Sequence, residues 1–195
     1  MNKDMQLPEV TLRAIEPEDL DVLYRIENDR QLWGEGITNV PYSRYILHEY
    51  IATSSADIYT DKQVRFMIID PQGVAVGIAD LVNFNPKHRR AEVGLMLMSQ
   101  YRGRGYASAA LKELCRYSSE VLNINQLYAV VSTDNIKSIT MLKRMGFHES
   151  GVLSEWLCNG CEYSDAIILQ KNYKKMILSF GGIKKIVNFA PLKTK

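Results

Sequence analysis

Two glycines alternate with two arginines at residues 102–105, directly before a long run of residues with helical spacing. The first turn of a helix leaves about four backbone N–H groups unpaired and carries partial positive charge. Glycine lets a bulky anion approach that backbone closely, and Arg102 and Arg104 add full positive charges. The stretch therefore predicts a cradle for a pyrophosphate. The alternative is a tight turn at Gly103 and Gly105 with arginines at the surface.

Two other phosphate-binding patterns are excluded by the same residues. No Gly-Lys-Ser or Gly-Lys-Thr follows the glycines, so the stretch is not a Walker loop. A dinucleotide fingerprint needs a third glycine and a place after the first strand, whereas Gly103 and Gly105 lie in the middle of the chain.

The elements on either side must position this stretch, and the spacing of apolar residues predicts them. Strands are expected at residues 9–15, 64–70, 74–84, 90–98, 126–132, 147–157 and 162–170. Helices are expected at residues 16–29, 43–55 (capped by Ser43), 105–121 and 135–146. Some strands follow one another directly and others are joined by helices, which predicts a single α+β domain. We expect a central mixed, mostly antiparallel sheet with helices on both faces.

The last two predicted strands are joined by a C-x-x-C pattern, Cys158-Asn159-Gly160-Cys161. This spacing occurs in zinc knuckles and redox pairs, but no second pair of ligands lies nearby and no helix begins there. Asn159-Gly160 is a strong signal for a type I′ turn, which favours two cysteines that flank the turn of a hairpin. The three histidines form no cluster with metal-ligand spacing, so we expect no bound metal.

Charge is divided unevenly along the chain. Seven lysines and no acidic residue follow Gln170, whereas residues 1–170 carry 22 acidic and 17 basic residues, a net charge of −5. The acidic body favours encounter with a cationic substrate. We divide the chain into a domain at residues 1–173 and a basic C-terminal tail at residues 174–195, which we expect to be partly packed or mobile. Aromatic residues are not interleaved among the lysines, so we expect a solvated tail and no bound nucleic acid.

Composition and hydropathy place the protein among globular proteins of one domain. The chain has 195 residues, of which 46% are hydrophobic and 24% charged. No apolar run approaches the roughly 18 residues of a membrane span, and the first ten residues lack the apolar core of a signal peptide. We therefore expect a cytoplasmic protein without a membrane partner.

Two motifs resemble those of the GCN5-related N-acetyltransferase (GNAT) family. They are Gln100-x-x-Gly103-x-Gly105-x-Ala107, and Asn135-x-x-Ser138 followed by Met141-Leu142 and Gly146-Phe147. In that family the first motif binds the pyrophosphate of acetyl-CoA. The resemblance therefore implies acetyl-CoA as the cosubstrate, and it runs from about Leu12 to Tyr173.

Three further stretches are similar to bacterial spermidine N-acetyltransferases, a branch that also holds ribosomal-protein N-terminal acetyltransferases. They are residues 85–92, 121–128 and 163–167. The resemblance implies direct transfer of acetyl to a primary amine in a ternary complex, with a polyamine such as spermidine as the favoured acceptor. The alternatives are the N-terminus of a ribosomal or other protein as acceptor, and a catalytically silent acyl-CoA-binding module. Because the polyamine branch often forms rings, the resemblance also suggests a homo-oligomer.

The resemblance implies that acetyl-CoA binds at the end of the strand expected at residues 90–98 and in the glycine-rich stretch. The implied residues are Leu97, Met98, Gln100, Arg102, Gly103, Arg104, Gly105, Tyr106, Ala107 and Asn135. Backbone N–H groups of residues 95–98 would stabilise negative charge on the thioester oxygen, if this strand separates from its neighbour as it does in the family. Asn135 would hydrogen-bond the pantetheine arm, and it is equally the predicted N-cap of the next helix.

The acceptor amine must lose a proton, because an amine with a pKa of about 10.4 is neutral in only about one molecule in 10³ near pH 7. Glu92 is the predicted general base, acting through water, and it would also attract the cation. The alternative is an ion pair with Arg89 or Arg90 on the surface of the strand. Trp33 and Glu35 complete the predicted amine site, since they lie in the loop that grips polyamine in the spermidine branch.

Leu142 departs from the spermidine branch, which places a tyrosine there that is thought to protonate the departing thiolate. Leucine has no proton to give. The thiolate then leaves unprotonated, which its reference pKa of about 8.5 makes feasible, or it takes a proton from another donor. Ser138 is the candidate donor on the same helix. The alternative for Ser138 is a small residue that packs against the neighbouring strand.

Overall fold

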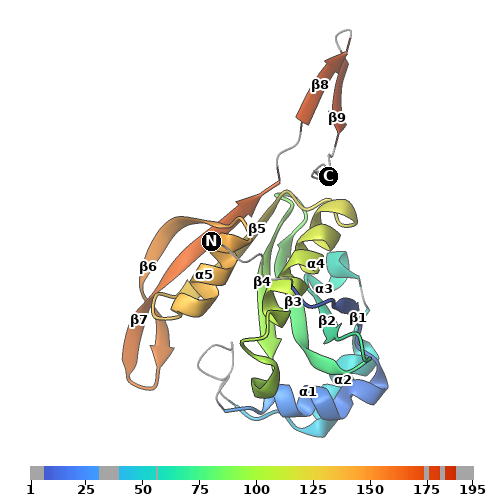
Figure 1. Cartoon of the computed structure of the whole chain (residues 1–195), viewed down its shortest axis with the longest axis vertical. Helices are drawn as coiled ribbons and strands as arrows, with labels where there is room; N and C mark the ends of the chain where they lie inside the picture. Colours follow the sequence, from blue (N-terminus) through green and yellow to red (C-terminus); the bar gives the residue numbers. More distant parts are fainter. Residues whose placement is uncertain (1–6, 31–39, 56, 174–175, 181–182, 188–195) are drawn as a thin grey trace.

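A seven-stranded sheet forms the centre of the molecule in the computed structural model, which describes residues 7–30, 40–55, 57–173, 176–180 and 183–187 (Figure 1). Its strands are β1 (Thr11–Ala14), β2 (Val64–Ile69), β3 (Ala75–Asn85), β4 (Arg90–Leu97), β5 (Gln126–Ser132), β6 (His148–Asn159) and β7 (Glu162–Asn172). The spatial order is β1-β2-β3-β4-β5-β7-β6. Neighbouring strands are antiparallel except for β4 and β5, which are parallel, so the predicted mixed and mostly antiparallel sheet is confirmed.

Helices cover both faces of the sheet, as predicted. They are α1 (Leu20–Glu27), α2 (Arg44–Thr53), α3 (Ile58–Asp61), α4 (Tyr106–Glu120) and α5 (Ile136–Arg144). On one face, Leu23 and Ile26 of α1 and Leu47 of α2 pack against Met67 of β2 and Ile78 of β3. On the other face, α4 and α5 share one large core cluster with the strands. Successive residues of a strand point to opposite faces, so the two layers of helices use alternate strand residues.

Local signals account for several element ends. The Ser43 side chain accepts a hydrogen bond from the backbone N–H of Ile46, at 3.1 Å, and so caps α2 as predicted. Gly146 follows the end of α5 with a φ of +87°, a left-handed conformation that glycine adopts without strain. In both cases the residue type at the boundary of a run with helical spacing predicts where the helix begins or ends.

Two features differ from the prediction. The single turn α3 was not expected, because four residues are too few to show helical spacing; it is held by the buried side chain of Ile58 and capped by Asp57. The hairpin between β6 and β7 turns at Gly160–Cys161 rather than at Asn159–Gly160, since Asn159 still pairs with Glu162. A turn with its positive φ at the first position suits Gly160, whose φ is +69°.

The C-terminal segment contains a separate two-stranded sheet, β8 (Met176–Phe180) with β9 (Ile183–Val187). Neither strand pairs with the central sheet, and Figure 1 shows this hairpin beyond the end of the central sheet. Within the described ranges, no helix is long and apolar enough to cross a membrane.

Candidate active site

The glycine-rich stretch lies between β4 and α4 and presents a row of unpaired amides. A 3-10 turn at Ser99–Tyr101 leads into it, and Gly103 and Gly105 have φ values of +74° and +85°. None of the six backbone N–H groups from Gly103 to Ser108 donates a hydrogen bond to any group that the structure describes. Six free N–H groups at the start of a helix of 15 residues can bind a polyanion such as a pyrophosphate.

The side chains of the same stretch contribute in different ways. Arg104 is exposed, whereas Arg102 turns back, and its Nε donates to the carbonyl oxygen of Leu97 at 3.1 Å. Arg102 therefore ties the stretch to the end of β4 while its two terminal nitrogens keep their positive charge. Tyr106 packs edge-to-face against Tyr101, with ring centroids 6.0 Å apart. Tyr106 and the part-buried Ala107 thus offer their main chain, not their side chains, to an anion.

The parallel strands β4 and β5 separate after three pairs of residues. The pairs are Arg90 with Gln126, Ala91 with Leu127, and Glu92 with Tyr128. From Val93 to Leu97, β4 is paired with β3 alone. The expected separation of this strand from its neighbour is therefore present. It leaves one side of the backbone of Leu97 and of its neighbours on β4 without a strand partner.

Glu92 lies at the point where the two strands separate. Its Oε2 accepts a hydrogen bond from Nδ2 of Asn83 at 2.8 Å. Among the described residues it forms no salt bridge, so the alternative of an ion pair with Arg89 or Arg90 is wrong. The strand register placed Asn83 next to Glu92, at an irregularity in β3 where Asn83 has a φ of +52°. Such bulges redirect a side chain.

Tyr128 is the partner of Glu92 on β5, and the sequence analysis did not single it out. Glu92 and Tyr128 share the sheet face on which α1 and α2 lie, because the preceding residues, Ala91 and Leu127, belong to the opposite core. Burial raises the pKa of Tyr128, and the charge of Glu92 raises it further. Alternation within β5 would have predicted the face, but only the strand register identifies Glu92 as the partner.

The second motif forms the start of α5. The Oδ1 atom of Asn135 accepts from the backbone N–H of Ser138 at 3.1 Å, so the predicted N-cap is confirmed. The side-chain amide of Asn135 has no acceptor among the described residues and is available to a ligand. Leu142, one turn beyond Ser138 on α5, is only 3% exposed and belongs to the core beneath that helix.

Four further predicted site residues remain, together with the two cysteines of the C-x-x-C pattern, which were predicted to flank a turn. Gln100 is exposed, and Met98 packs with the core below α1 and α2. Trp33 and Glu35 lie outside the described residues. Cys158 and Cys161 are exposed free thiols, Cys158 on β6 and Cys161 in the turn itself, and in the described part of the chain no group of three potential metal ligands occurs.

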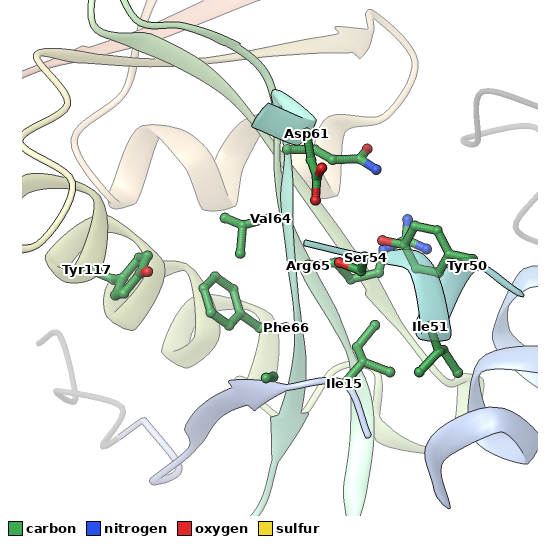
Figure 2. Close-up of a pocket in the computed structure, with 11 residues that line it drawn as sticks. Ile15, Tyr50, Ile51, Ser54, Asp61, Val64, Arg65, Phe66 and Tyr117 are labelled. Carbon is green, nitrogen blue, oxygen red and sulfur yellow. The ribbon is translucent and has the colours of Figure 1, made fainter. Parts of the chain in front are cut away.

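A cavity of about 280 Å³ lies apart from these residues, at the edge of β2 between α2 and α4 (Figure 2). Phe66 and Tyr117 form an edge-to-face pair on one side, with ring centroids 5.1 Å apart, and Tyr50 lies on the other. Arg65 lies between them, with its guanidinium bonded twice to Asp80. No sequence-predicted site residue that the structure describes lines this cavity, so it is not part of the candidate active site.

Comparison with known proteins places this geometry in a family. Residues 9–148 match the model of the acetyltransferase (GNAT) domain. Spermidine N(1)-acetyltransferase of Escherichia coli K12 is 31% identical over 175 residues, which cover 84% of this chain and 88% of that protein. The crystal structure of spermidine N-acetyltransferase from Vibrio cholerae in complex with CoA and spermine has a TM-score of 0.76 at 27% identity, covering 84% of this chain and 95% of that one.

A second structure of the Vibrio cholerae enzyme, described as dodecameric, has a TM-score of 0.71 at 28% identity and covers 84% of this chain and 94% of that one. The family match spans most of the chain, and the mixed, mostly antiparallel seven-stranded sheet agrees with the fold of these neighbours. The protein belongs to the GNAT acetyltransferases, a family of enzymes that use acetyl-CoA. Its relatives include spermidine N-acetyltransferases at 28–31% identity over most of the chain.

Proposed function

We propose that this enzyme moves the acetyl group of acetyl-CoA directly to a primary amine of a polyamine such as spermidine. One observation carries the proposal: a carboxylate, Glu92, lies at the point where β4 and β5 separate, with an uncharged partner. A carboxylate not neutralised by a bound cation can attract an ammonium group and accept its proton. The names of the relatives support a polyamine as the acceptor.

Acetyl-CoA fits the residues at the start of α4. The six unpaired N–H groups from Gly103 to Ser108 would hold the pyrophosphate, with the charges of Arg102 and Arg104 beside them. Asn135 would bind the pantetheine arm through the side-chain amide that its capping bond leaves available. The separated part of β4, including Leu97, would direct backbone N–H groups at the thioester oxygen, whereas the N–H of Met98 donates to the carbonyl oxygen of Val76 at 3.1 Å. Acetyl-CoA supplies the activated acetyl group.

The acceptor would approach from the face of the sheet that carries Glu92. There Glu92 would accept a proton from the ammonium group, directly or through water, and Asn83 would hold the carboxylate in place. Trp33 and Glu35 remain the predicted contacts for the far end of the amine. The net charge of −5 on residues 1–170 favours a cationic acceptor over a neutral one.

Three further expectations belong to this proposal. The chain would act as a homo-oligomer, as the dodecameric neighbour does. It would act in the cytoplasm. The catalytic domain would end near Tyr173, and the basic segment from residue 174 onward would not be needed for the chemistry.

A thiol-release assay tests the proposal. The enzyme is given acetyl-CoA with spermidine, spermine, putrescine, an aminoglycoside or a ribosomal N-terminal peptide, and free CoA is followed by reaction with a thiol reagent. We expect release with the polyamines at rates well above the amine-free hydrolysis. Release with the peptide alone would move the acceptor to protein N-termini. Binding of acetyl-CoA without release for any amine would leave a silent acyl-CoA-binding module.

A further inference from the structure

The leaving thiolate lacks an evident proton donor at the position of Leu142. That side chain is apolar and buried in the core beneath α5. The strand segments that line the separation, residues 93–97 and 129–132, contain one hydroxyl group, on Ser132. The Ser132 hydroxyl already accepts a hydrogen bond from the N–H of Asp134 at 3.3 Å.

Tyr128 is the hydroxyl that the fold places next to both the separation and the base. It stands opposite Glu92 in the last pair before β4 and β5 separate, on the face of the sheet shared with Glu92. Asn83, from β3, completes a row of three polar side chains on three neighbouring strands, and its Nδ2 donates to Oε2 of Glu92. A phenol and a carboxylate in contact can exchange a proton.

We propose that the Tyr128 hydroxyl gives its proton to the departing CoA thiolate and regains a proton from Glu92. The proposal rests on the acetyl transfer proposed above and assigns a second catalytic residue to it. Tyr128 would thereby do from β5 what Leu142 is unable to do from α5.

The protons balance over the cycle. The substrate ammonium ion gives one proton to the Glu92 carboxylate and becomes the free amine. The amine nitrogen forms its bond to the acetyl carbon, the bond from that carbon to sulfur breaks, and the sulfur keeps the electron pair. The sulfur takes the proton of Tyr128, and the resulting phenolate takes the proton that Glu92 holds. The second proton of the nitrogen leaves to solvent through the restored carboxylate, so the products are the acetamide, CoA thiol and one released proton.

The electrostatics of the pair suit such a relay. Because burial and the Glu92 charge raise the pKa of Tyr128 above its ordinary value, the phenol keeps its proton throughout the neutral range. Transfer from a phenol alone to a thiolate with a reference pKa of about 8.5 is uphill. In the relay the protonated carboxylate of Glu92 replaces the proton that the phenol gives up, so no phenolate accumulates. The nearby Arg90 charge acts against the shift, and the net direction remains upward.

The test is the variant Tyr128→Phe, which removes the hydroxyl and keeps the ring. We expect kcat with spermidine to fall by about 10²–10⁴-fold, the usual effect of losing an acid or base. The dissociation constant of acetyl-CoA, measured by calorimetry, should change by less than about twofold, since the ring stays. The matched control is Tyr117→Phe, which removes another part-buried hydroxyl, on the side of the molecule with the separate cavity. That control should retain wild-type kcat.

A measurement without substrate checks whether Tyr128 and Glu92 interact. Both proteins are titrated and followed by ultraviolet absorbance. Subtracting the curve of Tyr128→Phe from that of wild type isolates the phenol of Tyr128, whose pKa should lie above 10. In the Glu92→Gln background the same difference should titrate at lower pH, because the carboxylate charge is gone. The variant that carries both Glu92→Gln and Tyr128→Phe should be no slower than Glu92→Gln alone, because the effects of two members of one relay on the rate are not additive.

The outcomes separate the two proposals. A Tyr128→Phe enzyme with kcat within twofold of wild type overturns the relay and leaves the acetyl transfer intact. An unchanged phenol titration in the Glu92→Gln background also overturns it. Wild-type protein that releases no CoA with any amine overturns the acetyl transfer itself, and the titration still reports whether Tyr128 and Glu92 interact.

Discussion

Gly105 and Pro8 are in direct contact: a Cβ atom placed on Gly105 would lie 3.0 Å from Cδ of Pro8. The segment before β1 therefore packs against the start of α4, next to the unpaired amides. Gly103, two residues earlier, has nothing within 4 Å of such a Cβ. The two glycines of the motif thus differ: Gly105 is also a packing position, whereas Gly103 faces open space.

Substitution of Gly103 tests the phosphate-binding role with the least disturbance of packing. Gly103→Ala places a methyl group beside the free amides and strains a φ of +74° by about 1–2 kcal/mol. We expect the affinity for acetyl-CoA, measured by calorimetry, to fall by about tenfold or more. Gly105→Val should lose acetyl-CoA binding and also lower the melting temperature. The control is Gly151→Ala on β6, where open space surrounds the new Cβ. Unchanged affinity in folded Gly103→Ala would remove the phosphate role.

Glu92→Gln keeps the size of the side chain and removes its charge. If Glu92 takes the proton of the amine, turnover should slow by about 10²–10⁴-fold while acetyl-CoA affinity stays nearly the same. Steady-state rates at pH 7–9 make the comparison. Glu113→Gln, which removes a carboxylate paired with Arg116 on the surface of α4, should leave the rate unchanged. Near wild-type rates for Glu92→Gln over this pH range would assign Glu92 a structural role.

Leu142→Tyr would return a hydroxyl to the position where the spermidine branch has one. Because Leu142 is 3% exposed, the larger ring must displace its neighbours, and overpacking costs about 1–3 kcal/mol. We expect a melting temperature lower by several degrees, with polyamine acetylation retained or raised. Leu142→Met, of similar volume, should cost less than about 1.5 kcal/mol and leave activity unchanged. Abolished acetylation in a folded Leu142→Tyr variant would contradict this expectation.

The ion pairs of Arg65 should contribute far more to stability than those at the surface. Arg65 makes two bonds of 2.8 Å to Asp80 and an ion pair with Glu27, so it ties β2 to β3 and to the end of α1. Burial lowers the pKa of Arg65, but the carboxylates raise it more, so Arg65 stays charged. Asp80→Ala leaves that charge poorly compensated and should cost about 3–5 kcal/mol in chemical denaturation. Arg116→Ala, which breaks exposed pairs, should cost no more than about 1 kcal/mol.

The ionisation of Asp19 should make the stability of the protein depend on pH in the acid range. Two bonds from Arg13 and one from the N–H of Glu16 lower the pKa of Asp19 below its reference value of 3.8, against the opposing effect of burial. Because the pKa of Asp19 is lower in the folded than in the unfolded protein, its ionisation stabilises the fold at any pH above the unfolded pKa. This stabilisation is lost as the pH falls through the folded pKa. Asp19→Asn should therefore be less stable than wild type at pH 7, with the difference closing below about pH 4.

Periodic apolar residues were enough to predict most of the sheet. The strand β5 has the bounds that its apolar run predicted, and Gly105 and Val121 stand on either side of α4. The turn α3 escaped prediction because one buried residue, Ile58, makes no period. The hairpin turn moved by one residue because the pairing of Asn159 with Glu162 extends the ladder, a choice that the local turn signal does not encode.

The candidate site was harder to predict because its contacts join different strands. Arg89 and Arg90 are near Glu92 in sequence and suggested ion pairs. The bulge in β3 supplies Asn83 as the partner of Glu92 instead. Tyr128 lies beside Glu92 only through the parallel register of β4 and β5. The sequence was enough to propose Glu92 as the base and residues 102–105 as the phosphate-binding stretch, whereas the neighbours of Glu92 required the strand register.

The three pairs of residues that join β4 to β5 also limit how the domain holds together. By backbone pairing, the sheet consists of one block from β1 to β4 and a second block of β5, β7 and β6, with a short seam between them. A ligand that fills the separation touches both blocks and acts as a removable crosslink. Saturation at about 100 times the dissociation constant adds about 2.7 kcal/mol to the folded state. If acetyl-CoA binds there as proposed, it stabilises the folded enzyme by joining the two blocks, and this stabilisation is lost each time CoA leaves.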